Sequence, residues 1–145
     1  MTKRHGATKA AMLRTIPSLS RCSQRELATI GAAGDEIVLP AGRVLMAEGE
    51  RGDEAFLIVE GSAEVKVAGE TVAEVGPGDF VGEMALLERR PRTATVVATS
   101  PLRVLAIGAR RFPGLLDLPG VAWAVSRALA ERLRLADSVR VPVAV

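Results

Sequence analysis

The sequence of 145 residues has little of what many enzymes and secreted proteins depend on. It contains one cysteine (Cys22), one histidine (His5), one tryptophan and no tyrosine. A lone cysteine excludes an intrachain disulfide, so cysteine usage gives no sign of an oxidising compartment. A lone histidine excludes a cluster of imidazole metal ligands and a histidine-based dyad or triad in the body of the chain. We therefore expect no metal site, no catalytic residues and no enzymatic activity.

Long apolar runs are also missing. No stretch approaches the roughly 20 apolar residues that a membrane-spanning helix requires. The N-terminus has basic residues but lacks the apolar core of a signal peptide, and no phosphate loop of the Gly-Lys-Ser/Thr type occurs. These absences predict a cytoplasmic protein without a membrane span.

Acidic residues are absent from one part of the chain. The net charge is +2, but residues 1–25 contain no aspartate or glutamate and carry the basic residues Lys3, Arg4, Lys9, Arg14, Arg21 and Arg25. We expect residues 1–11 to form a flexible, solvated basic arm. Contact of this arm with nucleic acid or an anionic membrane surface remains an alternative.

The pattern of apolar and turn residues predicts the architecture. Ser23 and Glu26 form a capping box that begins a helix ending at Gly31 or Gly34, and a weaker helix is expected from Thr8 to Arg14. Between Asp35 and Ile107, short apolar runs alternate with turn residues at a spacing typical of an antiparallel sandwich or jelly-roll barrel. The expected strands are Glu36–Leu39, Arg43–Ala47, Ala55–Glu60, Ala63–Val67, Thr71–Val75, Thr93–Ala98 and Leu102–Ile107.

Helical periodicity returns after the strands. It predicts a short helix over Ala109–Leu116 and a longer one from Gly120 to about Ser138. The longer helix has one broad apolar arc, expected to dock on the barrel or on a partner, formed by Val121, Ala122, Val125, Ala128, Leu129, Leu133, Leu135 and Ala136. Arg132 lies inside this arc. Trp123 lies on the polar side, where it either packs on a neighbouring loop or marks an oligomer contact.

One segment interrupts the strands with chemistry of its own. From Gly82 to Thr95 the chain places a helix start after a glycine, then Glu83 and, nine residues later, Arg92. Unsatisfied main-chain N–H groups at Ala85 and Leu86 suit phosphate oxygens, and the Arg92 guanidinium offers a matching charged fork. Glu83 offers an acceptor for a ribose hydroxyl. The alternative is that Glu83 only caps its helix and Arg92 pairs with a surface acid.

These residues resemble the phosphate-binding cassette of the cyclic nucleotide-binding domain family, the type found in catabolite activator protein and protein kinase A regulatory subunits. The family pattern is Phe-Gly-Glu-Leu/Ile-Ala-Leu, a short variable stretch and Pro-Arg-Thr/Ser/Ala-Ala-Thr/Ser; Val81 stands where the family usually has Phe. The resemblance implies a mainly β fold with flanking helices: a domain over 12–138, with an eight-stranded jelly roll over 34–108, hinge and lid helices over 109–138 and a tail over 139–145. The implied ligand-binding residues are Gly82, Glu83, Met84, Ala85, Leu86, Arg92, Thr93 and Ala94.

The resemblance also implies a mechanism. The nucleotide lies against the barrel and the last helix closes over its base as a lid, with Arg132 and Asp137 as candidate lid contacts. The expected ligand is cAMP, with cGMP as the alternative because Thr93 is compatible with guanine; no cofactor is expected.

The implied partner is an effector protein or a second copy bound through the C-terminal helix. We expect no direct DNA binding because 139–145 is too short for a recognition helix. Two alternatives stay open: a jelly-roll scaffold with an unused pocket, and the sensor fragment of a larger transcription regulator. The sensor hypothesis predicts that Arg92→Ala loses nucleotide affinity with little loss of stability, whereas the scaffold shows no nucleotide-induced rise in melting temperature.

Overall fold

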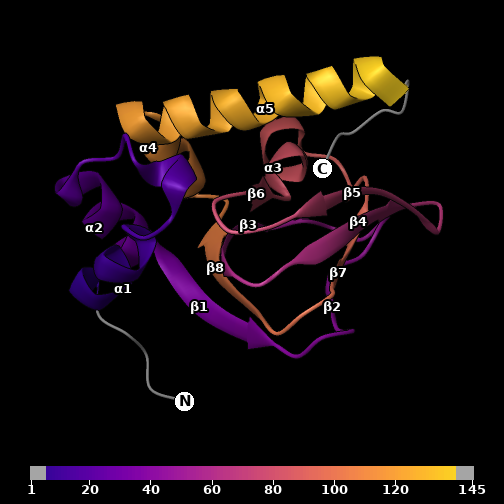
Figure 1. Ribbon diagram of the computed structural model, residues 1–145, viewed down its shortest axis with the longest axis horizontal. Helices are drawn as coiled ribbons and strands as arrows, with labels where there is room; N and C mark the ends of the chain where they lie inside the picture. Colours follow the sequence, from indigo (N-terminus) through magenta and orange to yellow (C-terminus); the bar gives the residue numbers. More distant parts are fainter. Residues whose placement is uncertain (1–5, 140–145) are drawn as a thin grey trace.

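The computed structural model describes residues 6–139, without the side chains of 6–8, 84, 87 and 132–139. Figure 1 shows a group of helices beside two curved sheets, with one long helix crossing above both. The helices are α1 (Gly6–Leu13), the 3-10 turn η1 (Pro17–Leu19), α2 (Gln24–Ala33), α3 (Glu83–Glu88), α4 (Phe112–Leu116) and α5 (Pro119–Val139). The strands are β1 (Gly34–Leu39), β2 (Val44–Met46), β3 (Glu54–Glu60), β4 (Ala63–Val67), β5 (Glu70–Val75), β6 (Phe80–Val81), β7 (Thr95–Ala98) and β8 (Leu102–Gly108).

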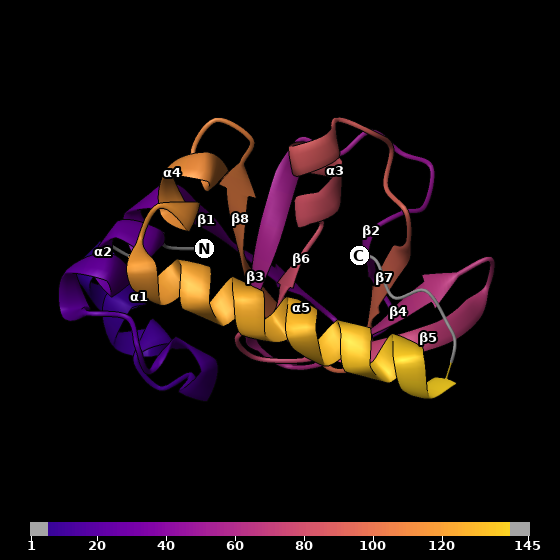
Figure 2. The same cartoon turned by 90° about the horizontal axis from the view of Figure 1, so that it is seen from above.

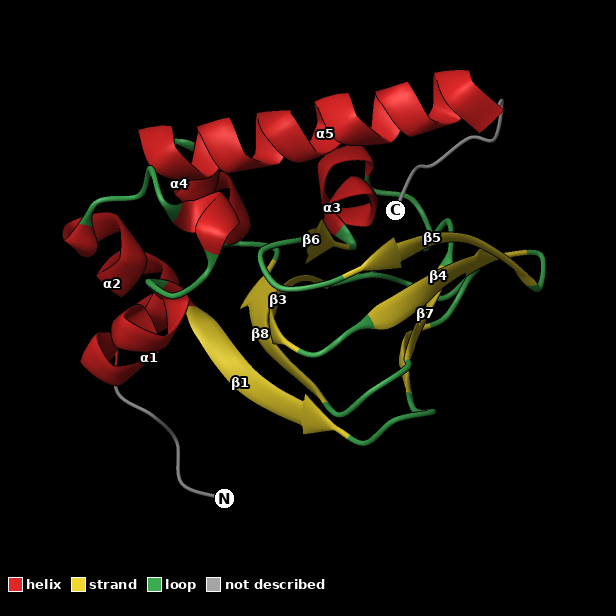
Figure 3. Cartoon of the chain, in the orientation of Figure 1, coloured by secondary structure: helices red, strands yellow, loops and turns green. Residues whose placement is uncertain are grey.

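The strands form two four-stranded antiparallel sheets, in the orders β1-β8-β3-β6 and β2-β7-β4-β5. Figure 3 shows the two sheets in yellow with α3 in red at one of their ends. The predicted fold class, antiparallel β with flanking helices, is confirmed. Most strand ends lie within one or two residues of the predicted ones, and two differences are larger. β6 was not predicted, and α4 begins at Phe112 because residues 109–111 form a turn in which Arg111 N–H donates to Gly108 O at 3.0 Å.

Strands β3 and β8 are buried on both faces. In β3, Phe56 and Ile58 belong to the core between the sheets, while Leu57 belongs to the core under the helices. In β8, Val104 belongs to the core between the sheets and Leu105 to the core under the helices. Successive side chains of a strand point to opposite faces, and each face of these two strands meets a separate core. Their sequences are therefore almost continuously apolar.

Part of the N-terminal segment is packed on the domain, in the helix α1 that stands close to the one expected over Thr8–Arg14. α1 includes Lys9, which is only 8% exposed and whose Nζ donates to Gly34 O at 2.7 Å. Lys9 and its neighbour Ala10 are therefore buried and not solvated, which differs from the expectation of a solvated arm at these two positions. Residues 1–5, with Lys3 and Arg4, lie outside the described part.

The capping box that begins α2 also holds the first turn of α5. Ser23 and Glu26 exchange the two predicted bonds, Ser23 N–H to Glu26 Oε1 at 3.2 Å and Glu26 N–H to Ser23 Oγ at 3.1 Å. The second carboxylate oxygen, Oε2, accepts from Gly120 N–H at 2.8 Å. One side chain thus satisfies main-chain donors at the start of two helices. The main-chain hydrogen bonds from Ser23 and then Gly120 lower the pKa of Glu26 below its ordinary value of 4.5.

We expect Glu26→Gln to lower stability by about 1 kcal/mol at neutral pH, as for the loss of a helix cap. Because the folded pKa is depressed, the carboxylate's contribution is present above pH 4.5 and is lost as the pH falls through the folded pKa. The stability difference between wild type and Glu26→Gln should therefore shrink on acidification. Urea denaturation across this range measures it, with Glu70→Gln in an exposed position as control. A difference that is constant with pH would contradict the double-cap role.

Only the first part of α5 is packed on the domain among the described side chains. Val121 and Ala124 are buried, whereas Leu129 is 41% exposed, so the predicted arc does not continue as a buried face. The Trp123 ring contacts the loop before α2, where the Arg21 guanidinium carbon lies 4.5 Å from the ring centre, in line with the loop hypothesis. The guanidinium carbon of Arg127, in α5 itself, lies 5.3 Å from the same ring. Figures 1 and 2 show the rest of α5 extending across the sheets toward β4 and β5. No described helix is both long and apolar enough to cross a membrane.

Candidate functional site

The six-residue helix α3 begins directly after Gly82, whose φ of 82° is in the left-handed region. A side chain there would be strained, and its Cβ would lie 2.4 Å from Arg92 Nη1 and 3.3 Å from Glu54 O. Glycine is therefore required by the backbone turn and by the close approach of the arginine. The predicted helix start after a glycine is present, and α3 joins the edge strand β6 to the segment leading into β7.

Arg92 reaches back under α3 and joins two separate elements. Its Nη1 donates to Gly82 O at 2.9 Å, and its Nη2 donates to Glu54 O, at the start of β3, at 2.7 Å. The guanidinium carbon lies 5.6 Å from the centre of the Phe56 ring. The side chain is 7% exposed. It is therefore not a surface arginine paired with a surface acid, and the fork is fixed in one position.

Two opposite charges are buried in this segment. Among the described side chains, the buried polar or charged ones are Lys9, Glu83 and Arg92, and Lys9 has its own carbonyl partner in β1. Glu83, the first residue of α3, is 3% exposed. Burial lowers the pKa of Arg92 from its ordinary value, opposed by the nearby carboxylates, of which Glu54 contributes most. Burying such charges carries a desolvation cost, and the rest of the fold must offset that cost to keep Glu83 and Arg92 in place.

The loop between β2 and β3 forms the other side of the arginine. Gly49 N–H donates to Arg92 O at 2.9 Å, and Arg92 N–H donates to Glu50 O at 2.8 Å. A Cβ on Gly52 would lie 2.6 Å from both Cζ and Nε of Arg92 and 2.9 Å from the Cβ of Ala85. Gly52 is thus a site residue that the sequence did not reveal. It sits in an evident turn, but no spacing rule connects that turn with an arginine forty positions later.

The other predicted site residues are placed as follows. Ala85 is buried, Leu86 and Thr93 are half-buried, and Ala94 belongs to the core between the sheets. Val81, which replaces the family phenylalanine, is fully buried in that same core. The side chains of Met84, Arg132 and Asp137 lie outside the described residues. The structure therefore brings together Gly82, Glu83, Ala85 and Arg92 and leaves the candidate lid contacts undescribed.

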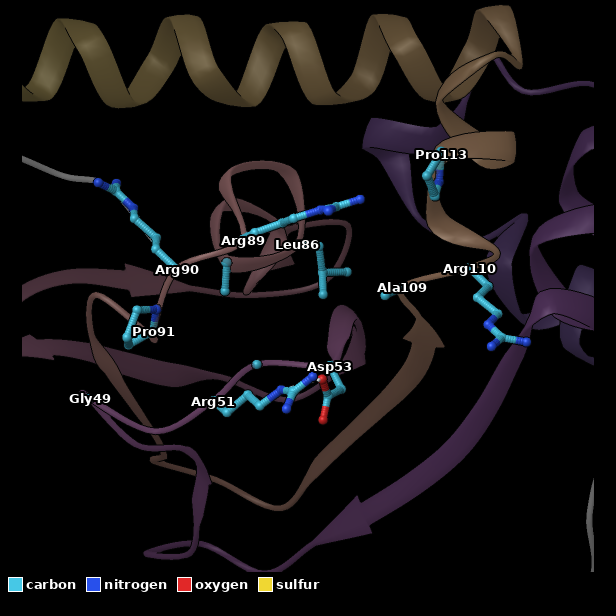
Figure 4. A pocket seen from close by; sticks show the side chains of 12 residues that line it. Gly49, Arg51, Asp53, Leu86, Arg89, Arg90, Pro91, Ala109, Arg110 and Pro113 are labelled. Carbon is cyan, nitrogen blue, oxygen red and sulfur yellow. Dashed lines mark ion pairs between the residues drawn. The ribbon is translucent and has the colours of Figure 1, made fainter.

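A cavity of about 820 Å³ opens beside α3. Figure 4 shows its walls: the β2–β3 loop below, α3 and the segment after it, and the start of α4 opposite. Its lining residues are Gly49, Arg51, Gly52, Asp53, Ala85, Leu86, Arg89, Arg90, Pro91, Ala109, Arg110 and Pro113. The two buried charges, Glu83 and Arg92, are not among them, although Gly52, which lies against the guanidinium, is.

Comparison with known proteins identifies, over most of the barrel, the same family that the cassette residues resemble. The family model of the cyclic nucleotide-binding domain matches residues 36–118. The cAMP-dependent protein kinase regulatory subunit of Emericella nidulans is 39% identical over 108 residues, covering 73% of this chain and 26% of that protein. The chain thus spans about a quarter of the length of such curated relatives.

Solved structures agree in fold. Catabolite activator protein from Thermus thermophilus superposes with a TM-score of 0.69 at 29% identity, over 83% of this chain and 60% of that one. The regulatory subunit of a cAMP-independent protein kinase A from Trypanosoma brucei superposes with a TM-score of 0.78 at 26% identity, over 95% and 50%. With its cassette geometry, its two-sheet barrel and a family match over more than half of its length, this chain belongs to the cyclic nucleotide-binding domain family.

Proposed function

We propose that this domain is a sensor that binds a cyclic nucleotide, cAMP in the first place, through the cassette of α3 and Arg92. The observation that carries the proposal is the pair of buried opposite charges, Glu83 and Arg92, at a short helix inserted between strands. A scaffold gains nothing from this arrangement, because apolar residues of similar volume would avoid the desolvation cost. A ligand with an anionic phosphate and a neighbouring hydroxyl matches both charges at once.

Each part of the cassette has a distinct task in this proposal. The Arg92 fork binds the cyclic phosphate, since a planar guanidinium matches two phosphate oxygens. The main-chain N–H groups of Ala85 and Leu86 donate to the same phosphate. Glu83 accepts a hydrogen bond from the ribose 2′-hydroxyl. Gly82 allows the backbone to approach the ligand closely. Thr93 and Ala94 extend the wall of the binding site toward β7.

A relay toward the C-terminal helices is supported by main-chain contacts. Ala109 N–H donates to Asp53 O at 3.0 Å, so the segment before α4 is tied to the loop that backs Arg92. α4 packs on α5, and α5 is held by Glu26 at its first turn. A ligand that draws α3 and this loop together changes the surface on which α4 packs, and hence the position of α5. This requires that the ligand binds the conformation with α3 and the loop close together more tightly than the conformation with them apart.

The role that follows is that of a receptor without turnover, which reports occupancy to an effector protein or to a second copy of the chain. The scaffold hypothesis differs in one measurable respect: it predicts no stabilisation by nucleotide. The relative from Trypanosoma brucei, a regulatory subunit of a cAMP-independent protein kinase A, shows why nucleotide binding must be measured.

Isothermal titration of the full chain with cAMP and with cGMP tests the proposal. We expect binding of both, with the lower Kd for cAMP, the nucleotide named in the description of the 39% identical regulatory subunit from Emericella nidulans. 5′-AMP is the matched control, because it has the same base but lacks the cyclic phosphate, and it should bind far more weakly. A lower Kd for cGMP would reverse our order of ligands, and absence of binding by either would favour the scaffold.

A further inference from the structure

The cavity beside α3 shares Ala85 and Leu86 with the cassette but differs from it in its charged groups. Neither Glu83 nor Arg92 is among its lining residues, whereas Gly52, which does line it, lies directly against the buried guanidinium. Its charged lining consists of four arginines and one carboxylate: Arg51, Arg89, Arg90, Arg110 and Asp53. A concave site with such an excess of one sign concentrates anions.

Half of this positive charge has no internal partner in the part of the chain that is described. Arg51 pairs with Asp53 at 3.3 Å, and Arg90 pairs with Glu88 at 3.0 Å. Arg89 and Arg110 form no ion pair with another described residue, and they come from opposite walls. In Figure 4 the Arg89 side chain extends from the end of α3 toward the side of the cavity where Ala109 and Pro113 lie.

Arg89 occupies a position that does not suit an arginine for conformational reasons. It is the C-cap of α3, with φ 53° and ψ 46°, in the left-handed region. Glycine is the usual residue at such helix ends because a side chain there is strained. A long cation at this position costs stability, and its head extends over the cavity. Strained positions of this kind are found preferentially where a side chain has a task.

We propose that this cavity is a second anion site, which binds a small molecule carrying at least two phosphate groups, with Arg89 and Arg110 as its anchors. Each guanidinium presents a fork that matches phosphate oxygens, and the two arginines line the cavity from different elements. The volume of about 820 Å³ lies within the range of small-molecule sites. The enclosing walls on three sides favour such a compact polyanion over an extended acidic peptide.

The site has a regulatory consequence that rests on the proposed function. A ligand held between the end of α3 and the segment before α4 fixes the distance between the cassette and the hinge. It therefore changes cyclic nucleotide affinity, and by linkage the cyclic nucleotide changes the affinity of this second site by the same factor.

Calorimetric titration of the full chain with sodium pyrophosphate, at constant ionic strength and without cyclic nucleotide, tests the site directly. Pyrophosphate should bind wild type, and Arg89→Gly and Arg110→Ala should each weaken it by about tenfold or more, the loss expected for a charge-assisted hydrogen bond. Arg89→Gly should also raise the melting temperature by relieving the left-handed strain, so that a fall in affinity is not a failure to fold. An ADP arm distinguishes a nucleotide from a free polyphosphate: tighter binding of ADP than of pyrophosphate indicates that a base is also held.

The matched control is Arg14→Ala with Arg43→Ala, which removes two exposed arginines outside the cavity and should leave pyrophosphate binding unchanged. Equal weakening by this control, or no binding to wild type, would overturn the proposal. Tighter binding of a hexaglutamate peptide than of pyrophosphate would overturn it in favour of an acidic protein partner. The two proposals fail separately: Arg89→Gly should still bind cAMP, and a chain that binds pyrophosphate but no cyclic nucleotide refutes the sensor alone.

Discussion

Arg92→Ala should lower cyclic nucleotide affinity by about 100-fold or more, the usual cost of removing one partner of a buried charge-assisted contact. The cause is the loss of the fork that receives the phosphate, together with a buried Glu83 left without this compensating charge. The same variant should lose stability, contrary to the expectation from the sequence. Removing the guanidinium takes away the donors to Gly82 O and Glu54 O, at a cost on the order of 2 kcal/mol.

Three variants separate binding from folding. Arg92→Lys keeps a charge but loses the fork, so it should retain more stability than Arg92→Ala while binding nucleotide weakly. Arg14→Ala, an exposed arginine remote from the cassette, should match wild type in both respects. Titration with cAMP and urea denaturation give the two readouts. Unchanged nucleotide affinity in Arg92→Ala would leave the scaffold as the better account.

Gly52→Ala should weaken cAMP binding by about tenfold or more although it changes no group that touches the ligand. The added Cβ would overlap the Arg92 guanidinium carbon at 2.6 Å and Ala85 Cβ at 2.9 Å. The flexible end of the arginine gives way more easily than the main chain, so its bond to Glu54 O should break before the fold does. A misplaced fork loses much of its binding energy, since bidentate recognition depends on geometry.

Gly108→Ala is the matched control for Gly52→Ala, because a Cβ on Gly108 meets nothing within 4 Å. It should bind cAMP as wild type does. Circular dichroism should show that Gly52→Ala remains folded, which assigns the loss to the position of Arg92. If Gly52→Ala binds cAMP with wild-type affinity, the predicted position of the arginine relative to the ligand is wrong.

The sequence predicted the parts of the fold that depend on local patterns. Turn residues between apolar runs located seven of the eight described strands, and the capping box at Ser23 and Glu26 is present with both of its bonds. The two-residue strand β6 was missed because Phe80 and Val81 lie between turn residues and are too few to show alternation. The burial of Lys9 was missed because its partner, Gly34 O, is supplied only by tertiary structure.

The candidate site likewise has residues that the sequence could predict and residues that it could not. Glu83 and Arg92 could be named because both belong to one continuous motif with fixed spacing. Gly52, Glu54 and Phe56 could not, because they contact Arg92 from another strand and its preceding loop. The second role of Glu26, at Gly120, likewise depends on two helices meeting in space. Periodicity gave the apolar arc of α5, but whether a residue such as Leu129 is covered depends on a partner that periodicity does not specify.

A crystal structure of the full chain grown with excess cAMP tests the central claim most directly. The account predicts the cyclic phosphate within hydrogen-bonding distance of the Arg92 guanidinium and of the Ala85 and Leu86 N–H groups, with the ribose 2′-hydroxyl on Glu83. It would be contradicted by an Arg92 that still binds only Gly82 O and Glu54 O, beside a cassette without nucleotide.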